Sequence, residues 1–124
     1  MDSGKILIID SSKKDMNSLS ALLGEEGYQA YRADTGREGI KKLKSDVFDL
    51  IITDIAFTDI KGVDLIPQLK RAAKKKIPIL ILSGQDDAEE IEGFFQQGID
   101  DYIVKPPRLS YFLKKVESLV LGAR

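Results

Sequence analysis

Five short apolar segments, separated by longer stretches with apolar residues at helical spacing, are the feature that most limits how this chain can fold. The segments are residues 5–9, 28–33, 50–53, 77–82 and 102–104. Four of them are nearly continuous in apolar residues, which is typical of parallel strands covered on both faces and not of half-exposed antiparallel strands. The sequence therefore predicts five parallel strands.

The stretches between these segments predict helices, because their apolar residues recur every three or four positions. The apolar stripes are Met16, Leu19, Leu22 and Leu23; Ile40 and Leu43; Leu65, Ile66, Leu69, Ala72 and Ala73; Ile91, Phe94 and Phe95; and Leu109, Phe112, Leu113, Val116 and Val120. Ser12 and Asp15 have the spacing of a capping box at the start of the first helix. Thr35 and Glu38 repeat that spacing before the second. Pro67 must lie near the first turn of its helix or kink it.

The alternation of strands and helices predicts an α/β fold, a doubly wound five-stranded parallel sheet of (βα)5 type with helices on both faces. Five units are too few for an eight-stranded barrel. With 124 residues, and about 150 residues in a typical domain, we expect one domain over residues 1–124. Ligands of such open sheets bind beyond the carboxyl ends of the strands, where the strand order reverses.

Four polar residues follow the predicted strands at that edge. Asp10 follows the first strand, Asp54 the third, Ser83 the fourth and Lys105 the fifth. Two carboxylates and an ammonium group are what a hard cation such as Mg²⁺ and a transferable phosphoryl group require. Any one of these residues alone is better explained as a polar strand end facing water. Their coincidence at one edge predicts a site.

The composition excludes several classes of function. The chain has no histidine and no cysteine, which excludes imidazole acid–base chemistry, cysteine nucleophiles and thiolate metal sites. Its 19 basic and 20 acidic side chains argue against direct nucleic-acid binding. The apolar run at residues 79–82 is far shorter than the roughly 18 residues that suggest a membrane span, and residues 1–5 lack the apolar stretch of a signal peptide. We expect a cytoplasmic protein with no membrane contact.

Five motifs extend along nearly the whole chain, roughly over residues 5–119. They are KILIID at the start, FDLIITDI around Asp54, KG at Lys61, IPILILSG around Ser83, and GIDDYIVKP ending in Lys105 and Pro106. Together they resemble the response-regulator receiver domain of two-component signalling, which has a flavodoxin-like (βα)5 fold. The resemblance implies a signalling domain and not an enzyme. It also implies two kinds of partner: a histidine kinase or histidine phosphotransfer protein, and an output domain or protein partner.

The resemblance implies roles for six positions. Asp54 is the phosphoacceptor, Asp10 and the backbone carbonyl of Ala56 join it in binding Mg²⁺, Lys105 is the family's lysine, Ser83 is the switch hydroxyl and Tyr102 the switch aromatic. The metal offsets the repulsion between the carboxylates and the phosphoryl group. An inward step of Ser83 toward the phosphoryl group vacates space for Tyr102. Tyr102 is equally well explained as a half-buried strand residue with a hydrated hydroxyl.

The sequence departs from the family pattern at three places. The family usually carries two adjacent acids after the first strand, and this chain has Asp10 and Ser11. Because a hydroxyl is a weaker ligand for Mg²⁺ than a carboxylate, we expect reduced metal affinity. The family's Met-Pro is replaced by Phe57-Thr58, so the loop is expected to be more mobile. Pro107 stands where the family usually has phenylalanine.

Two alternatives to phosphoacceptance stay open. The first is a pseudo-receiver that acts as a protein-binding module without phosphorylation, which the change at Ser11 favours. The second, a small flavodoxin-like enzyme or nucleotide binder, has little support because the chain lacks the GxxxxGK[ST] and GxGxxG loops.

Two runs of charged residues lie at predicted helix ends, a basic run at the end of the third helix and an acidic run at the start of the fourth. The basic run is Lys70, Arg71, Lys74, Lys75 and Lys76, and the acidic run is Asp86, Asp87, Glu89, Glu90 and Glu92. Favourable interaction with the helix dipoles and water accounts for both. A role of the acidic run in selecting a partner is the functional alternative.

Overall fold

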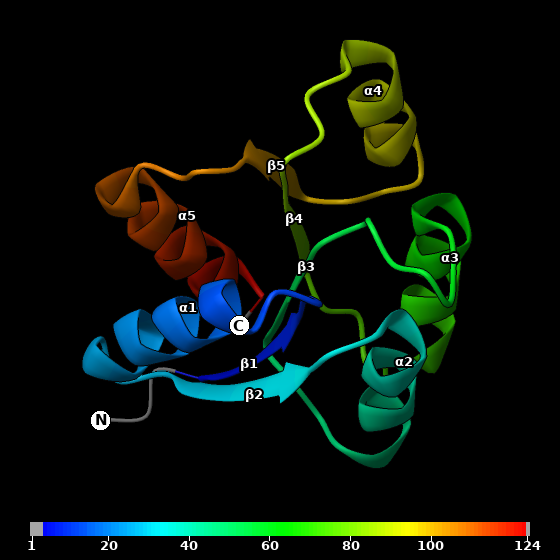
Figure 1. Ribbon diagram of the computed structural model, residues 1–124. Coiled ribbons are helices and arrows are strands. Elements are labelled where there is room, and N and C mark those ends of the chain that lie inside the picture. The colour runs from blue at the N-terminus through cyan, green and yellow to red at the C-terminus, as the bar shows by residue number, and fades with distance from the viewer. Residues whose placement is uncertain (1–3, 124) are drawn as a thin grey trace.

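The computed structural model describes residues 4–123, in which five strands alternate with five helices (Figure 1). The strands are β1 (Lys5–Ile9), β2 (Gln29–Ala33), β3 (Leu50–Thr53), β4 (Ile79–Ser83) and β5 (Asp101–Val104). The helices are α1 (Lys13–Glu25), α2 (Gly36–Ser45), α3 (Gly62–Ala72), α4 (Ala88–Gln96) and α5 (Leu109–Gly122). The predicted (βα)5 fold is confirmed.

All strand pairs are parallel, and the sheet order is β2-β1-β3-β4-β5. The order reverses at β1, which has β2 on one side and β3 on the other. In the register of β1 with β3, Ile9 pairs with Thr53. The next residue on each strand is therefore an aspartate, Asp10 or Asp54, and the N–H of Asp54 donates to the carbonyl of Ile9 at 2.8 Å. The topology thus places both carboxylates at the switch point.

The core has two layers, because successive side chains of a strand point to opposite faces of the sheet. Leu7 and Ile9 of β1 pack with residues of α2, α3 and α4, whereas Ile6 and Ile8 pack with residues of α1 and α5. All four are at most 1% exposed. Since burying an aliphatic side chain contributes about 1.5–3 kcal/mol, this two-sided burial explains the continuous apolar runs.

Four strand boundaries differ from the sequence prediction. The second strand starts at Gln29, the fourth at Ile79 and the fifth at Asp101. Pro78, which was expected inside the fourth strand, has no N–H to donate to a ladder. The fourth strand also runs one residue further than predicted, so Ser83 is its last residue.

The predicted apolar stripes contain two residues that are not in the core. Phe95 is 42% exposed and Leu109 is 55% exposed. The nine-residue α4 buries only one side chain fully, that of Phe94, and α5 begins at Leu109, before its packed stripe of Phe112 and Val116. Periodicity alone does not say which turns of a helix reach the core.

Pro67 lies in the second turn of α3, just beyond the first turn, and the helix continues to Ala72. A proline removes the N–H that would bond to the carbonyl four residues earlier, that of Val63. Gln97, the C-cap of α4, supplies the missing donor: its Nε2 donates to the Val63 oxygen at 2.8 Å. The proline is therefore accommodated by a contact between two helices.

None of the helices within residues 4–123 has the length and apolar character that a bilayer span requires.

Candidate functional site

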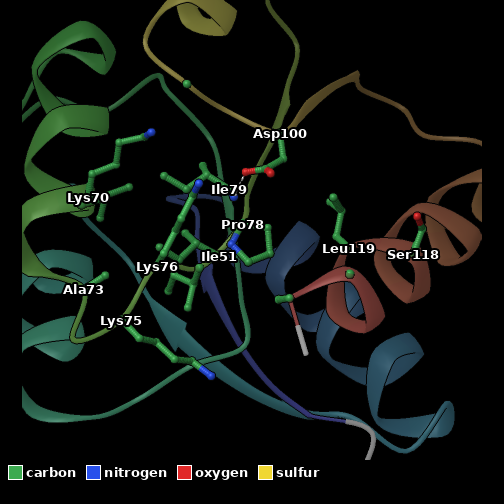
Figure 2. Close-up of a pocket in the computed structure, with 15 residues that line it drawn as sticks. Ile51, Lys70, Ala73, Lys75, Lys76, Pro78, Ile79, Asp100, Ser118 and Leu119 are labelled. Carbon is green, nitrogen blue, oxygen red and sulfur yellow. Dashed lines mark hydrogen bonds between the residues drawn. The ribbon is translucent and has the colours of Figure 1, made fainter.

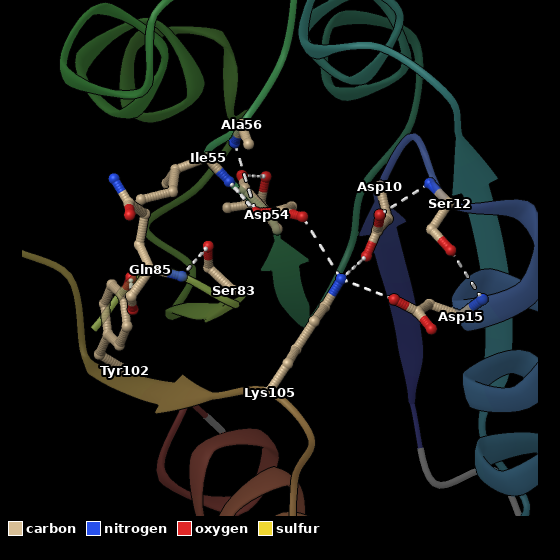
Figure 3. A network of polar contacts seen from close by, with 11 residues as sticks. Asp10, Ser12, Asp15, Asp54, Ile55, Ala56, Ser83, Gln85, Tyr102 and Lys105 are labelled. Carbon is tan, nitrogen blue, oxygen red and sulfur yellow. Dashed lines mark hydrogen bonds and ion pairs between the residues drawn. The ribbon is translucent and has the colours of Figure 1, made fainter.

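Three predicted site residues meet at the carboxyl edge of the sheet (Figure 3). Asp10 follows β1, Asp54 follows β3, and Lys105 follows β5. The N–H of Lys105 donates to the carbonyl of Ser83 at 2.8 Å, which continues the pairing of β5 with β4. From this position the lysine side chain extends toward the two aspartates.

The Lys105 ammonium is the centre of the network. Its Nζ lies 2.8 Å from an oxygen of Asp10, 2.8 Å from one of Asp15 and 3.3 Å from one of Asp54. The side chain is 18% exposed. Burial by itself lowers the pKa of Lys105, but the hydrogen bonds that it donates to Asp10 and Asp15 outweigh this effect, so the pKa of Lys105 lies above its usual value. The lysine therefore carries a fixed positive charge at this edge.

Backbone N–H groups orient the two predicted metal-binding carboxylates. Oδ1 of Asp10 accepts from Ser12 at 2.9 Å. Oδ1 of Asp54 accepts from Ile55 at 2.6 Å and from Ala56 at 3.3 Å. In each aspartate the other oxygen, Oδ2, contacts the ammonium. These bonds fix which oxygen of each carboxylate faces the site.

Asp15, in the first turn of α1, belongs to the network although its sequence pattern pointed to another role. Half of the predicted capping box is present, since the Ser12 hydroxyl accepts from the N–H of Asp15 at 3.2 Å. The reciprocal bond is not the one expected: the Ser12 N–H donates to Asp10, and the Asp15 carboxylate pairs with Lys105. Hydrogen bonding to Lys105 holds the pKa of Asp15 below its usual value, against the opposing effect of burial.

Ser83 and Tyr102 are both hydrogen-bonded to Gln85, in the segment between β4 and α4. The buried Ser83 hydroxyl accepts from the Gln85 N–H at 3.2 Å, and the Tyr102 hydroxyl donates to the Gln85 carbonyl at 2.8 Å. The half-buried Tyr102 ring stacks on Phe94 with ring centroids 6.4 Å apart. Burial raises the pKa of Tyr102 above its usual value. The Tyr102 hydroxyl is thus bonded to a backbone carbonyl, that of Gln85.

The loop that follows Asp54 is anchored to the start of α2. Asp59 accepts hydrogen bonds from the N–H of Gly36 at 3.3 Å and of Arg37 at 3.0 Å. Ile60 packs so closely over Gly36 that a Cβ there would lie 2.3 Å from its side chain, and only glycine fits. The loop thus has a tertiary anchor in place of the family's proline, while its mobility stays a prediction.

The oxygen donors at this edge match the preference of Mg²⁺ for carboxylates and carbonyls. Asp10 and Asp54 are 3% and 12% exposed at their side chains, and Ala56 and Ser11 are exposed. Within residues 4–123, no group of three or more acidic, histidine or cysteine side chains is placed to hold a metal ion. The kinds of oxygen donor at this edge therefore suit Mg²⁺. Of the predicted ligands, the carboxylates of Asp10 and Asp54 are anionic, whereas the carbonyl of Ala56 is neutral.

A cleft of about 1090 Å³ lies at the opposite, amino edge of the sheet (Figure 2). Ile51, Pro78 and Ile79 lie between a side with Lys70 and a side with Leu119 of α5. The Asp10, Asp54 and Lys105 network does not line it. The network is therefore identified by its convergent charges and not by an enclosed cavity.

The two charged runs have the predicted helix-end positions. Asp87 caps α4 by accepting from the N–H of Glu89 at 2.9 Å, and Glu89 and Glu90 lie in the first turn. Lys70 and Arg71 lie in the last turn of α3. Charges of these signs stabilise these helix ends.

Comparison with known proteins identifies relatives of this chain. The family model described as "Response regulator receiver domain" matches residues 6–117. The cell cycle transcriptional regulator CtrA of Caulobacter vibrioides is 31% identical over 116 residues, which are 94% of this chain and 50% of that protein. Protein PilH of Pseudomonas aeruginosa is 29% identical over 95% of this chain and 98% of that protein. The chain thus spans about half the length of CtrA and nearly all of PilH.

Solved structures of response regulators resemble this chain in fold. A two-component response regulator from Clostridium difficile has a TM-score of 0.89 and 30% identity, over 94% of this chain and 95% of that one. A CheY-like receiver domain protein from Methanospirillum hungatei JF-1 has a TM-score of 0.89 and 26% identity, over 96% and 94% of the two chains. Because the family model matches residues 6–117, which are most of this chain, the chain belongs to the response regulator receiver domain family.

Proposed function

We propose that this receiver domain, a single unit over residues 1–124, accepts a phosphoryl group on Asp54 in a cytoplasmic two-component phosphorelay. The observation that supports this most is the Lys105 ammonium, held between Asp54 and Asp10 at the switch point of the sheet. The 124 residues contain no histidine. In this proposal the donor imidazole belongs to a histidine kinase or a histidine phosphotransfer protein.

The transfer proceeds by attack of an Asp54 carboxylate oxygen on the phosphorus of the donor. An oxygen–phosphorus bond forms while the bond from phosphorus to the imidazole nitrogen breaks, and the electron pair leaves with the imidazole. Oδ2 is the attacking oxygen, because Oδ1 is held by two backbone N–H groups. Later, water attacks the phosphorus, which releases inorganic phosphate and restores the carboxylate.

Positive charge is what this reaction needs most, since an anion approaches two carboxylates. Lys105 supplies one charge from the chain itself. Mg²⁺, which Asp10, Asp54 and the carbonyl of Ala56 would hold, supplies the rest by offsetting the repulsion between anions.

The switch uses the shared connection of Ser83 and Tyr102 to Gln85. The Ser83 hydroxyl now accepts from Gln85, and its own proton is available to a phosphoryl oxygen on Asp54. A step of this segment toward Asp54 displaces the carbonyl that Tyr102 bonds, so the ring follows and the surface over β4 and β5 changes. An output domain or protein partner reads that change.

Phosphorylation is tested with the full chain, Mg²⁺ and acetyl phosphate, followed by intact mass. The expected result is the addition of one phosphoryl group to the wild type and none to Asp54→Asn. Asp49→Asn, at the other end of the same strand, is the matched control and is expected to be modified like the wild type. No addition to the wild type at any Mg²⁺ concentration would overturn the proposal.

A phosphorylation-independent binding module is the second candidate, and Ser11 is the observation that favours it. If the metal site is too weak to support phosphoryl transfer, the surface over β4 and β5 binds its partner in the conformation seen in the structure. The mass experiment with Ser11→Asp separates the two: modification of the variant alone supports the binding module, and modification of both chains supports the phosphoacceptor.

A further inference from the structure

The ammonium of Lys105 has all of its hydrogen-bonding capacity in use. A lysine ammonium has three N–H donors, and here three carboxylates accept from it, those of Asp10, Asp15 and Asp54. While the bond between Asp54 Oδ2 and phosphorus is still unformed, a phosphoryl oxygen of the donor that bonds to Lys105 must therefore replace one of these carboxylates.

The three carboxylates differ in how much water reaches them. The Asp10 side chain is 3% exposed and that of Asp54 is 12% exposed, whereas that of Asp15 is 41% exposed. A buried carboxylate that loses its cation is left poorly hydrated, which is costly. An exposed carboxylate that loses its cation regains water, which reduces the cost of the loss. Asp15 is therefore the partner that Lys105 releases most easily.

The position of Asp15 is fixed by the start of α1. Its N–H donates to the Ser12 hydroxyl at 3.2 Å, and the next residue, Met16, is 3% exposed in the core. The Ser12 N–H in turn donates to Asp10. The carboxylate of Asp15 is thus presented to Lys105 by the same turn that orients Asp10.

From these contacts we infer that Asp15 is a positioning residue, which holds the Lys105 ammonium in place until a phosphoryl oxygen replaces its carboxylate. The inference rests on the proposed phosphorylation of Asp54. Asp15 acts in two ways: it keeps the lysine extended over the site, and it opposes modification, because its carboxylate competes with the phosphoryl group for the same N–H donor.

The test compares the wild-type chain with Asp15→Asn, Asp15→Glu and Asp86→Asn. Asp86→Asn removes one carboxylate charge after β4 and leaves the three partners of Lys105 in place. With Mg²⁺ and limiting acetyl phosphate, Asp15→Asn is expected to be phosphorylated about two- to fivefold faster, the range set by an exposed ion pair. Asp15→Glu restores the slower wild-type rate, and Asp86→Asn has a smaller effect that is lost at high salt.

A second measurement follows the lysine side-chain ammonium signals by NMR, without phosphodonor. The Lys105 signal, assigned with Lys105→Arg, is expected to shift in Asp15→Asn and to stay in place in Asp86→Asn. An unchanged Lys105 signal in Asp15→Asn overturns the inference, as does an unchanged or slower rate of phosphorylation. If the wild type takes up no phosphoryl group, the proposed function fails, and the lysine spectrum still decides whether Asp15 holds Lys105.

Discussion

The hydroxyl of Tyr102 donates a 2.8 Å hydrogen bond to the backbone carbonyl of Gln85. The N–H of the same residue donates to Ser83. Because one residue is bonded to both predicted switch positions, a movement of Ser83 that carries the Gln85 backbone with it would also move the hydrogen-bond partner of Tyr102. This connection gives the predicted switch a physical linkage that sequence motifs alone do not describe.

Tyr102 is expected to titrate above pH 10.0, because burial raises the pKa of its hydroxyl. Above pH 10 the tyrosine of the unfolded chain ionises first, so the unfolded state binds fewer protons. The contribution of Tyr102 to stability is therefore complete below pH 10 and lost as the pH rises through the folded-state pKa. With no tryptophan among the 124 residues, tyrosinate absorbance measures it directly. A wild-type minus Tyr102→Phe difference with a midpoint at or below 10 would contradict this.

Ser11→Asp is expected to strengthen Mg²⁺ binding, because it adds a carboxylate beside Asp10 and Asp54. Calorimetric titration should show a dissociation constant lower by about tenfold, the smaller end of the effects seen when residues of a metal site are changed. Ser11→Asn, of similar size and without charge, is the matched control and should bind like the wild type. Equal affinities of Ser11→Asp and the wild type would show that the missing carboxylate is not what limits the site.

Asp59→Ala is expected to lower the free energy of unfolding by about 1 kcal/mol, as for loss of a helix cap. The reason is that Asp59 bonds the N–H groups of Gly36 and Arg37 at the start of α2. Urea unfolding measures the cost, and hydrogen exchange at these two amides should accelerate. Thr58→Ala, one residue earlier in the loop, is expected to change neither. Unaltered exchange at both amides in Asp59→Ala would count against the anchor.

Gln97 and Pro67 are expected to be energetically coupled through the Val63 carbonyl. Gln97→Ala removes the donor to that oxygen, whereas Pro67→Ala introduces a backbone N–H that can bond to it. The loss of the Gln97 hydrogen bond should therefore cost about 0.5–1 kcal/mol more when Pro67 is present. A double-mutant cycle by urea unfolding gives the coupling energy, and strictly additive effects would refute it.

Much of the fold was predictable because it depends on local patterns. Strands β1 and β3 have the predicted bounds, since apolar residues fill them on both faces. Asp10, Asp54 and Lys105 were found by following strands to their ends, because parallel strands place those ends at one edge. The exposure of Phe95 was not predictable, because the periodicity of α4 does not show how far the helix overlaps the sheet.

The sequence by itself determined the alternation of strands and helices, the two-sided core and the edge that carries the charges. These follow from periodicity and from the type of residue after each strand. Only the tertiary structure decided that Asp15 completes the set of carboxylates on Lys105, 90 positions away, and that Gln97 serves the carbonyl freed by Pro67. Such pairs depend on how strands and helices are placed against one another, and local patterns carry no information about that placement.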